Sequence, residues 1–101
     1  MLDLQTLPAE LGDICRFRHI ERLSIFGSAV RGELRADSDV DLLVEFEHGH
    51  AASYFELVEL SDQLSPLFGG RTVDLVTPHA LHRLIRAAVL SETRVIFEAI
   101  N

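Results

Sequence analysis

Apolar side chains recur along this chain at two spacings, which change from one segment to the next. Spacings of three and four residues are typical of helices that bury one face, and alternation of apolar and polar positions is typical of strands. The short loop between the first two strands favours an antiparallel pair, and helices between strands favour parallel pairs. We therefore expect an α/β (α+β) fold, with a small mixed sheet of about four strands covered by helices. The pattern predicts helix, strand, strand, helix, strand, helix and strand over residues 7–18, 20–26, 39–47, 53–67, 71–76, 77–89 and 94–97.

The strand at 39–47 has the clearest alternation, and its polar positions give the first sign of chemistry. Asp39 and Asp41 are two residues apart, so on a strand both carboxylates point from one face. Asp74 lies in the apolar strand at 71–76 and would join them if the two strands are neighbours. Such carboxylates suit Mg²⁺ or Mn²⁺. Two such ions can activate an attacking oxygen and stabilise a leaving oxygen in phosphoryl-type transfer.

A Gly-Ser turn follows the strand at 20–26 and has complementary properties. Gly27 would let the backbone approach a phosphate closely, and Ser28 offers a hydroxyl and an amide. A short helical turn at 29–34 would add further amides, which form an anion site. Arg31 or Arg35 could add a bidentate phosphate contact. An anion site beside metal-binding carboxylates predicts a site for a nucleoside triphosphate.

Composition narrows the class of protein. The 101 residues, 48% of them hydrophobic, fit one domain over 1–101. The net charge of −7 disfavours a nucleic-acid-binding protein, which needs a basic patch. Cys15 is the single cysteine, so no intramolecular disulfide is expected, and its helical spacing predicts a buried apolar role. No run approaches the ~20 apolar residues of a membrane span, so we expect a cytoplasmic protein without membrane contact.

Three simpler interpretations of the same motifs are disfavoured. All nine basic residues are arginines, and Glu33 and Leu34 follow Gly27–Gly32 where a P-loop requires Lys and Ser or Thr. A calcium loop beginning at Asp37 would need Gly where Leu42 stands. An isolated Asp-x-Asp also occurs in glycosyltransferases, but without an upstream Gly-Ser. The histidines lack metal-ligand spacing, and Tyr54 is predicted to pack in the first turn of its helix rather than to accept a modification.

The motifs together resemble a known family. Gly27-Ser28, ten intervening residues and Asp39-Val40-Asp41 are similar to the signature of nucleotidyltransferases related to DNA polymerase beta. With Asp74, the chain resembles the minimal nucleotidyltransferase antitoxins of HEPN/MNT toxin–antitoxin pairs. The resemblance implies transfer of AMP from ATP, with two Mg²⁺ ions, to a tyrosine of a cognate HEPN ribonuclease toxin. It also implies that Asp39, Asp41 and Asp74 bind metal, and that Gly27, Ser28 and Arg31 hold the triphosphate.

Two alternatives stay open for the function. The chain could neutralise a toxin by binding alone, as part of a hetero-oligomer, with its acidic charge masking a basic ribonuclease surface. It could also transfer a nucleotide to a small molecule. The sequence does not supply the additional domain that would enclose such an acceptor, so a protein acceptor is the expected case.

Overall fold

The computed structural model describes residues 7–27, 30, 35, 37–80 and 92–99. Four strands form one sheet in the spatial order β3-β2-β1-β4, where β1 is Ile20–Phe26, β2 is Val40–Phe46, β3 is Val73–Val76 and β4 is Arg94–Glu98. β2 pairs with β3 in parallel, whereas β1 is antiparallel to both β2 and β4. The predicted small mixed sheet is confirmed. In chain order, the described elements are α1 (Glu10–Phe17), β1 (Ile20–Phe26), β2 (Val40–Phe46), α2 (Tyr54–Leu64), the 3-10 helix η3 (Ser65–Phe68), β3 (Val73–Val76), the 3-10 helix η4 (Pro78–Ala80) and β4 (Arg94–Glu98).

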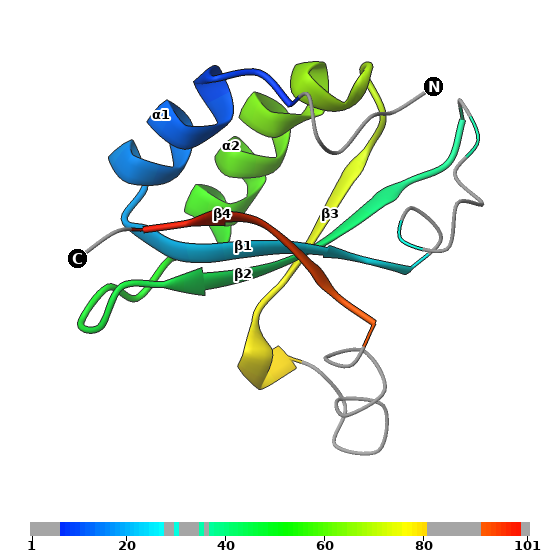
Figure 1. The fold of residues 1–101 in the computed structure, drawn as a ribbon. Coiled ribbons are helices and arrows are strands. Elements are labelled where there is room, and N and C mark those ends of the chain that lie inside the picture. Colours follow the sequence, from blue (N-terminus) through cyan, green and yellow to red (C-terminus); the bar gives the residue numbers. More distant parts are fainter. Residues whose placement is uncertain (1–6, 28–29, 31–34, 36, 81–91, 100–101) are drawn as a thin grey trace.

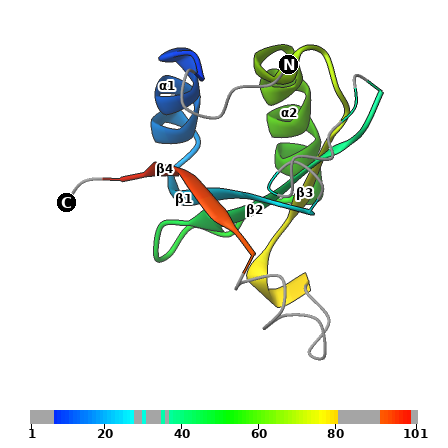
Figure 2. The ribbon, with the colours of Figure 1, turned by 45° about the vertical axis from the view of Figure 1, so that its right-hand side comes forward.

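Both α-helices cover the same face of the sheet (Figures 1 and 2). Cys15 is fully buried in the core beneath them, as its spacing predicted. Burial raises the pKa of the Cys15 thiol to about 12, because the charged thiolate would lose its hydration. No helix in the described part of the chain is long and apolar enough to cross a membrane. The core comprises Leu11, Cys15, Ile20, Leu23, Ile25, Val40, Leu42, Val44, Leu60, Leu64, Phe68 and Val73.

The ends of the helices differ in detail from the prediction. The residues after Leu7 form a turn, in which the Leu11 amide donates to the Pro8 carbonyl at 3.0 Å, and α1 begins only at Glu10. At α2, the Ser53 hydroxyl accepts from the Glu56 amide at 3.2 Å and caps the start of the helix. The last predicted turn is the 3-10 helix η3, because Pro66 lacks the amide that would continue an α-helix.

Two predicted segments fall largely outside the described residues. Of the helical turn expected at 29–34, the structure describes Val30. Of the helix expected at 77–89, it describes residues 77–80, which include η4. The remainder of both segments stays a prediction.

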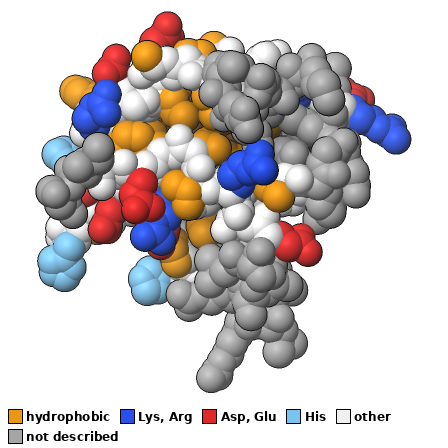
Figure 3. All heavy atoms as spheres, in the orientation of Figure 1, with side chains coloured by type: hydrophobic (Ala, Val, Ile, Leu, Met, Phe, Trp, Pro, Cys, Tyr) orange, Lys and Arg blue, Asp and Glu red, His pale blue; other side chains and the backbone are white. Residues whose placement is uncertain are grey.

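The face of the sheet opposite α1 and α2 carries charged side chains. Side chains alternate along β2, so Asp41 and Glu45 point away from the core that holds Val44. Arg22 on β1 pairs with Glu45 at 3.4 Å and with Glu98 on β4 at 3.1 Å. Acidic and basic side chains lie together at the left end of the sheet, below the helices (Figure 3). One end of this face therefore has paired charges, and the other end holds the predicted site.

Candidate active site

The predicted site begins where β1 ends. Phe26, the last residue of β1, is the register partner of Asp41, so the turn at Gly27 lies beside that carboxylate. Gly27 has a φ of +76°, and a Cβ atom added to it would lie 2.7 Å from Asp41 Oδ2. A larger residue would therefore be strained in its backbone and would also collide with the carboxylate. Glycine is needed at this turn because the backbone closely approaches an acidic side chain.

Asp74 lies beside Asp41 on the neighbouring strand. The two are register partners in the parallel pair of β2 and β3, so their side chains leave the same face of the sheet. Asp41 is half-buried and Asp74 is exposed. The site prediction required these two strands to be neighbours, and they are. Gly27, Asp41 and Asp74 thus come from the end of β1, from β2 and from β3 to one region of the sheet.

Asp39 immediately precedes β2 and is exposed. Among the described residues, no group of three or more His, Cys, Asp or Glu side chains is close enough to hold a metal ion together. The structure therefore places Asp41 and Asp74 side by side, and the described residues do not form a metal site of three carboxylates. The donor types still fit Mg²⁺, which binds through one or two carboxylates and completes its shell with water and substrate phosphates.

The structure describes only some of the residues that were predicted to bind phosphate. The Val30 amide donates to the Gly27 carbonyl at 3.2 Å, which closes a tight turn after β1. Ser28 and Arg31 lie outside the described residues, and their phosphate contacts stay predictions. Arg35, the alternative to Arg31, is exposed, and its amide donates to the Ser38 hydroxyl at 2.9 Å.

Arg71 holds the loop that leads into β2, a role that the sequence did not predict. Its Nε donates to the Arg35 carbonyl at 3.1 Å, and its Nη1 donates to the Phe68 carbonyl at 2.8 Å. Just beyond this contact, the Val40 amide donates to the Thr72 carbonyl at 2.9 Å and begins the pairing of β2 with β3. Arg71 is therefore a positioning residue for the start of β2, where Asp39 and Asp41 lie. Its partners are main-chain carbonyls, which leave no mark in a sequence pattern.

Comparison with known proteins identifies the family. The family model "Polymerase beta, Nucleotidyltransferase" matches residues 10–100. The chain belongs to this nucleotidyltransferase family. The protein adenylyltransferase MntA of Thermococcus cleftensis is 44% identical to this nucleotidyltransferase over 73 residues, which are 72% of this chain and 71% of MntA. A solved structure provisionally assigned as a minimal nucleotidyltransferase is 38% identical with a TM-score of 0.71, and the match covers 92% of this chain and 95% of that one.

Two further solved structures share the fold of this nucleotidyltransferase at low identity. A toxin–antitoxin complex with AMP-PNP matches with a TM-score of 0.73 at 18% identity, over 97% of this chain and 75% of that one. A Shewanella oneidensis complex of a tri-AMPylated HEPN toxin with an MNT antitoxin matches with a TM-score of 0.63 at 16% identity, over 96% and 74%. Both matches establish the nucleotidyltransferase fold.

The prediction that Tyr54 packs in the first turn of its helix is wrong, and whether it accepts a modification stays untested. This residue, the single tyrosine of the chain, is 77% exposed and lies edge-to-face against Phe55, with the ring centroids 6.3 Å apart. The buried side of α2 is formed by Leu60 and Leu64. At about 100° per residue, Tyr54 lies roughly a quarter-turn from that side, which explains its exposure.

Proposed function

We propose that this nucleotidyltransferase transfers AMP from ATP to a hydroxyl group of a partner protein. The observation that carries the proposal is the placement of Asp41 beside Asp74, with the Gly27 backbone closed against the Asp41 carboxylate. This arrangement puts an acidic pair next to the turn at which the sequence predicts an anion site. The similarity to a protein adenylyltransferase supports a protein acceptor.

The residues have separate roles in the proposed reaction. The acceptor oxygen attacks the α-phosphorus of ATP, the bond to the β-phosphate breaks, and pyrophosphate leaves with the electron pair. Asp74 would help to take the proton of the acceptor hydroxyl, and Gly27, Ser28 and Arg31 would hold the triphosphate. Bound Mg²⁺, expected as two ions, would offset the charge of the phosphates, and the residues that would hold it are Asp39, Asp41 and Asp74.

The proposed partner is a cognate HEPN ribonuclease toxin, and the proposed acceptor is a tyrosine on it. The fold match to a complex between an AMPylated HEPN toxin and an MNT antitoxin supports this choice. A net charge of −7 favours association with a basic nuclease surface, because opposite charges steer the encounter. Modification of the toxin would neutralise it, so the chain would act as an antitoxin.

The proposal is tested with ATP labelled on its α-phosphate, Mg²⁺ and a candidate HEPN toxin. We expect the toxin to become labelled, and we expect no labelling when a chelator removes Mg²⁺. Mass spectrometry should show a tyrosine that is heavier by the mass of AMP. Absence of label with an intact Asp39, Asp41 and Asp74 would contradict the proposal.

A double substitution separates catalysis from neutralisation by binding alone. Asp39→Asn with Asp41→Asn removes two charges from the site, whereas Asp62→Asn removes one from an exposed position on α2. We expect the double variant to lose both labelling and neutralisation of the toxin, and Asp62→Asn to retain both. If the double variant still neutralises the toxin, binding alone is sufficient. Label on an added small-molecule alcohol but not on the toxin would favour the other alternative.

A further inference from the structure

The outer edge of β3 has no strand beside it among the described residues, because β3 lies at the end of the sheet order. The Thr72 carbonyl, just before β3, accepts from the Val40 amide and so points toward β2. Consecutive residues of an extended chain direct their carbonyls to opposite edges, so the carbonyls of Arg71 and Val73 point to the outer edge. With four residues and one neighbouring strand, β3 depends on what contacts this edge.

Two serine hydroxyls bind these two outer carbonyls. Ser61 Oγ donates to the Val73 carbonyl at 2.7 Å, and Ser65 Oγ donates to the Arg71 carbonyl at 2.7 Å. Four residues of an α-helix rise about 6 Å, and two residues of a strand rise about 6.6 Å, so the spacing of the hydroxyls matches that of the carbonyls. The serines of α2 and η3 therefore take the place of a neighbouring strand at the start of β3.

The hydrogen bond of Ser61 differs from the usual behaviour of a serine inside a helix. Such a serine commonly donates to the carbonyl four residues before it, or faces water. Ser61 instead donates across to β3, from a half-buried position. Removal of its hydroxyl would take the donor away from the Val73 carbonyl, and a main-chain group that loses its partner away from water is costly. The bond thus ties α2 to the start of β3.

The bond from Ser61 reaches Asp74 through a single peptide unit. The Val73 carbonyl and the Asp74 amide belong to one planar group, so the hydroxyl that holds the carbonyl also fixes the orientation of the chain that enters Asp74. On the inner side of β3, Asp74 is the register partner of Asp41. The Asp74 side chain is exposed, so its carboxylate lies where its main chain places it.

We propose that Ser61 is a positioning residue for Asp74, and that Ser65 supports it by holding the chain just before β3. Without the Ser61 hydroxyl, β3 would shift relative to β2, and the separation of Asp41 and Asp74 would change. A misplacement of about 1 Å can cost a reaction on the order of a hundredfold. The effect on catalysis rests on the proposed transfer of AMP, whereas the effect on the position of Asp74 does not.

NMR of the full chain tests the position of Asp74 without any reaction. Ser61→Ala should shift the signals of the Val73 carbonyl carbon and the Asp74 amide, and it should speed hydrogen exchange of the Val40 amide, which bonds to the chain entering β3. Ser53→Ala is the matched control, because it removes a serine hydroxyl that caps the start of the same helix. It should leave these signals unchanged. Unchanged Val73 and Asp74 signals in Ser61→Ala would overturn the proposal.

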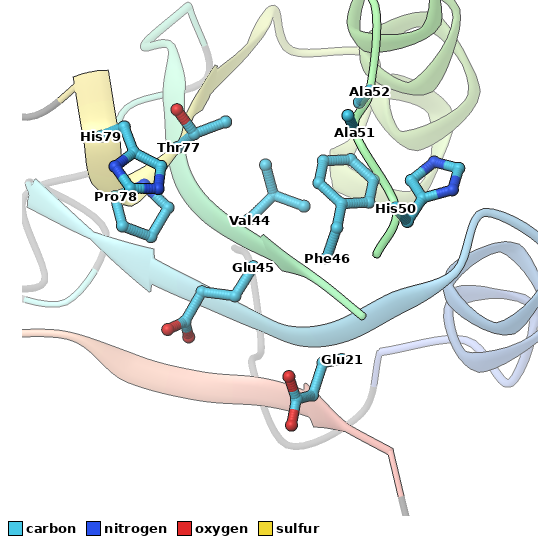
Figure 4. Close-up of a pocket in the computed structure, with 10 residues that line it drawn as sticks. All are labelled: Glu21, Val44, Glu45, Phe46, His50, Ala51, Ala52, Thr77, Pro78 and His79. Atoms are coloured by element: carbon cyan, nitrogen blue, oxygen red, sulfur yellow. The ribbon is translucent and has the colours of Figure 1, made fainter. Parts of the chain in front are cut away.

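The far end of β3 supplies an internal reference. Thr77 and His79 follow β3 and line a pocket of about 450 Å³ (Figure 4). Their amide signals should stay in place in Ser61→Ala, because the lost bond lies at the other end of the strand. Shifts as large at Thr77 and His79 as at Asp74 would indicate a general loosening of the protein and would overturn a positioning role.

Kinetics then test the consequence for AMP transfer, at a temperature where every variant is folded. Ser61→Ala should lower kcat about tenfold and change the KM for ATP by less than about twofold, as expected when a contact is lost mainly in the transition state. Ser65→Ala should lower kcat less, and Ser53→Ala should keep it. Ser61→Thr, where it retains the Val73 carbonyl signal, should retain the rate.

The outcomes separate this proposal from the proposed function. A shifted Asp74 signal in Ser61→Ala with an unchanged kcat would limit Ser61 to a structural role and overturn the positioning role. If the unsubstituted protein transfers no AMP, the proposed function fails, and the NMR signals alone decide whether Ser61 positions Asp74.

Discussion

The two ends of β2 present different chemistry on one strand. At its start, Asp41 lies between β3 on one side and the end of β1 on the other. Its side chain points away from the core. At its end, residues 44–46 extend beyond the last residue of β3, and Glu45 pairs with Arg22. The first end is suited to hold ions and phosphates, and the second end carries a surface ion pair.

The two ends of β2 differ because β3 pairs with the first end and not with the second. β3 brings Asp74 to the first end and, through Pro78, cannot pair with the second. The length of β3 thus determines where along β2 a second carboxylate can lie beside the first. Substitutions at the two ends of β2 should therefore have separate effects on AMP transfer.

The largest effect is expected for Asp41→Asn. Loss of this charge should reduce AMP transfer on the order of a hundredfold or more, because preorganised electrostatic contacts at a reacting centre contribute this much. Glu45→Gln, on the same face of the same strand, is the matched control and should leave the rate of AMP transfer unchanged. The measurement is labelled-AMP transfer. Similar losses for both variants would show that the two ends are not separate.

A second large effect is expected for Gly27→Ala. The positive φ alone costs about 1–2 kcal/mol for a residue with a Cβ, and the added Cβ would also displace the Asp41 carboxylate from its position 2.7 Å away. Gly49 has a φ of +88° with nothing within 4 Å of an added Cβ, so Gly49→Ala carries the backbone cost alone. Denaturant unfolding should show the larger loss for Gly27→Ala.

Transfer activity distinguishes the two glycines further. Gly27→Ala should lose activity even at temperatures where it is fully folded, whereas Gly49→Ala should keep it. Equal stability and equal activity of the two variants would mean that contact with Asp41 is unimportant.

The sequence predicted the strands and the site residues to different extents. The alternation along 39–47 was enough to place Asp41 on the face away from the core, and Gly27 was recognisable as a turn residue. The register that puts Asp74 opposite Asp41 is a tertiary property, because it depends on how β2 and β3 pair although α2 and η3 lie between them in the chain. From the sequence alone, Asp74 could be placed beside Asp41 only on the assumption that their two strands are neighbours.

Other features had no sequence signal at all. Arg71 acts on two main-chain carbonyls, at Arg35 and Phe68, and neither acceptor depends on the residue type at those positions. The role of Pro78 at the end of the ladder becomes visible only with the register known. Tyr54 was misplaced because its packing depends on where the buried side of α2 faces the sheet.

An intermediate effect is expected for Arg71→Ala. The substitution removes two hydrogen bonds from a charged donor, in a half-buried position, and should cost roughly 2 kcal/mol. Arg16→Ala, which breaks an exposed pair with Asp13, should cost well under about 1 kcal/mol. Because Arg71 positions the start of β2, transfer activity should fall beyond the loss of folded protein, with Arg71→Lys recovering part of it.

The contrary result for Arg71 is also informative. If activity falls only in proportion to the unfolded fraction, Arg71 stabilises the fold without positioning Asp39 and Asp41. Activity and unfolding measured at the same temperature separate these cases.

The smallest effect is expected for Arg22→Gln, at the end of the sheet away from Asp41 and Asp74. Arg22 bridges Glu45 and Glu98 on the surface, and such exposed pairs contribute about 0–1 kcal/mol, which high salt removes. Denaturant unfolding at low and high salt should show a small loss that disappears with salt, and AMP transfer should not change. A loss of stability that persists at high salt would contradict an exposed, screened pair.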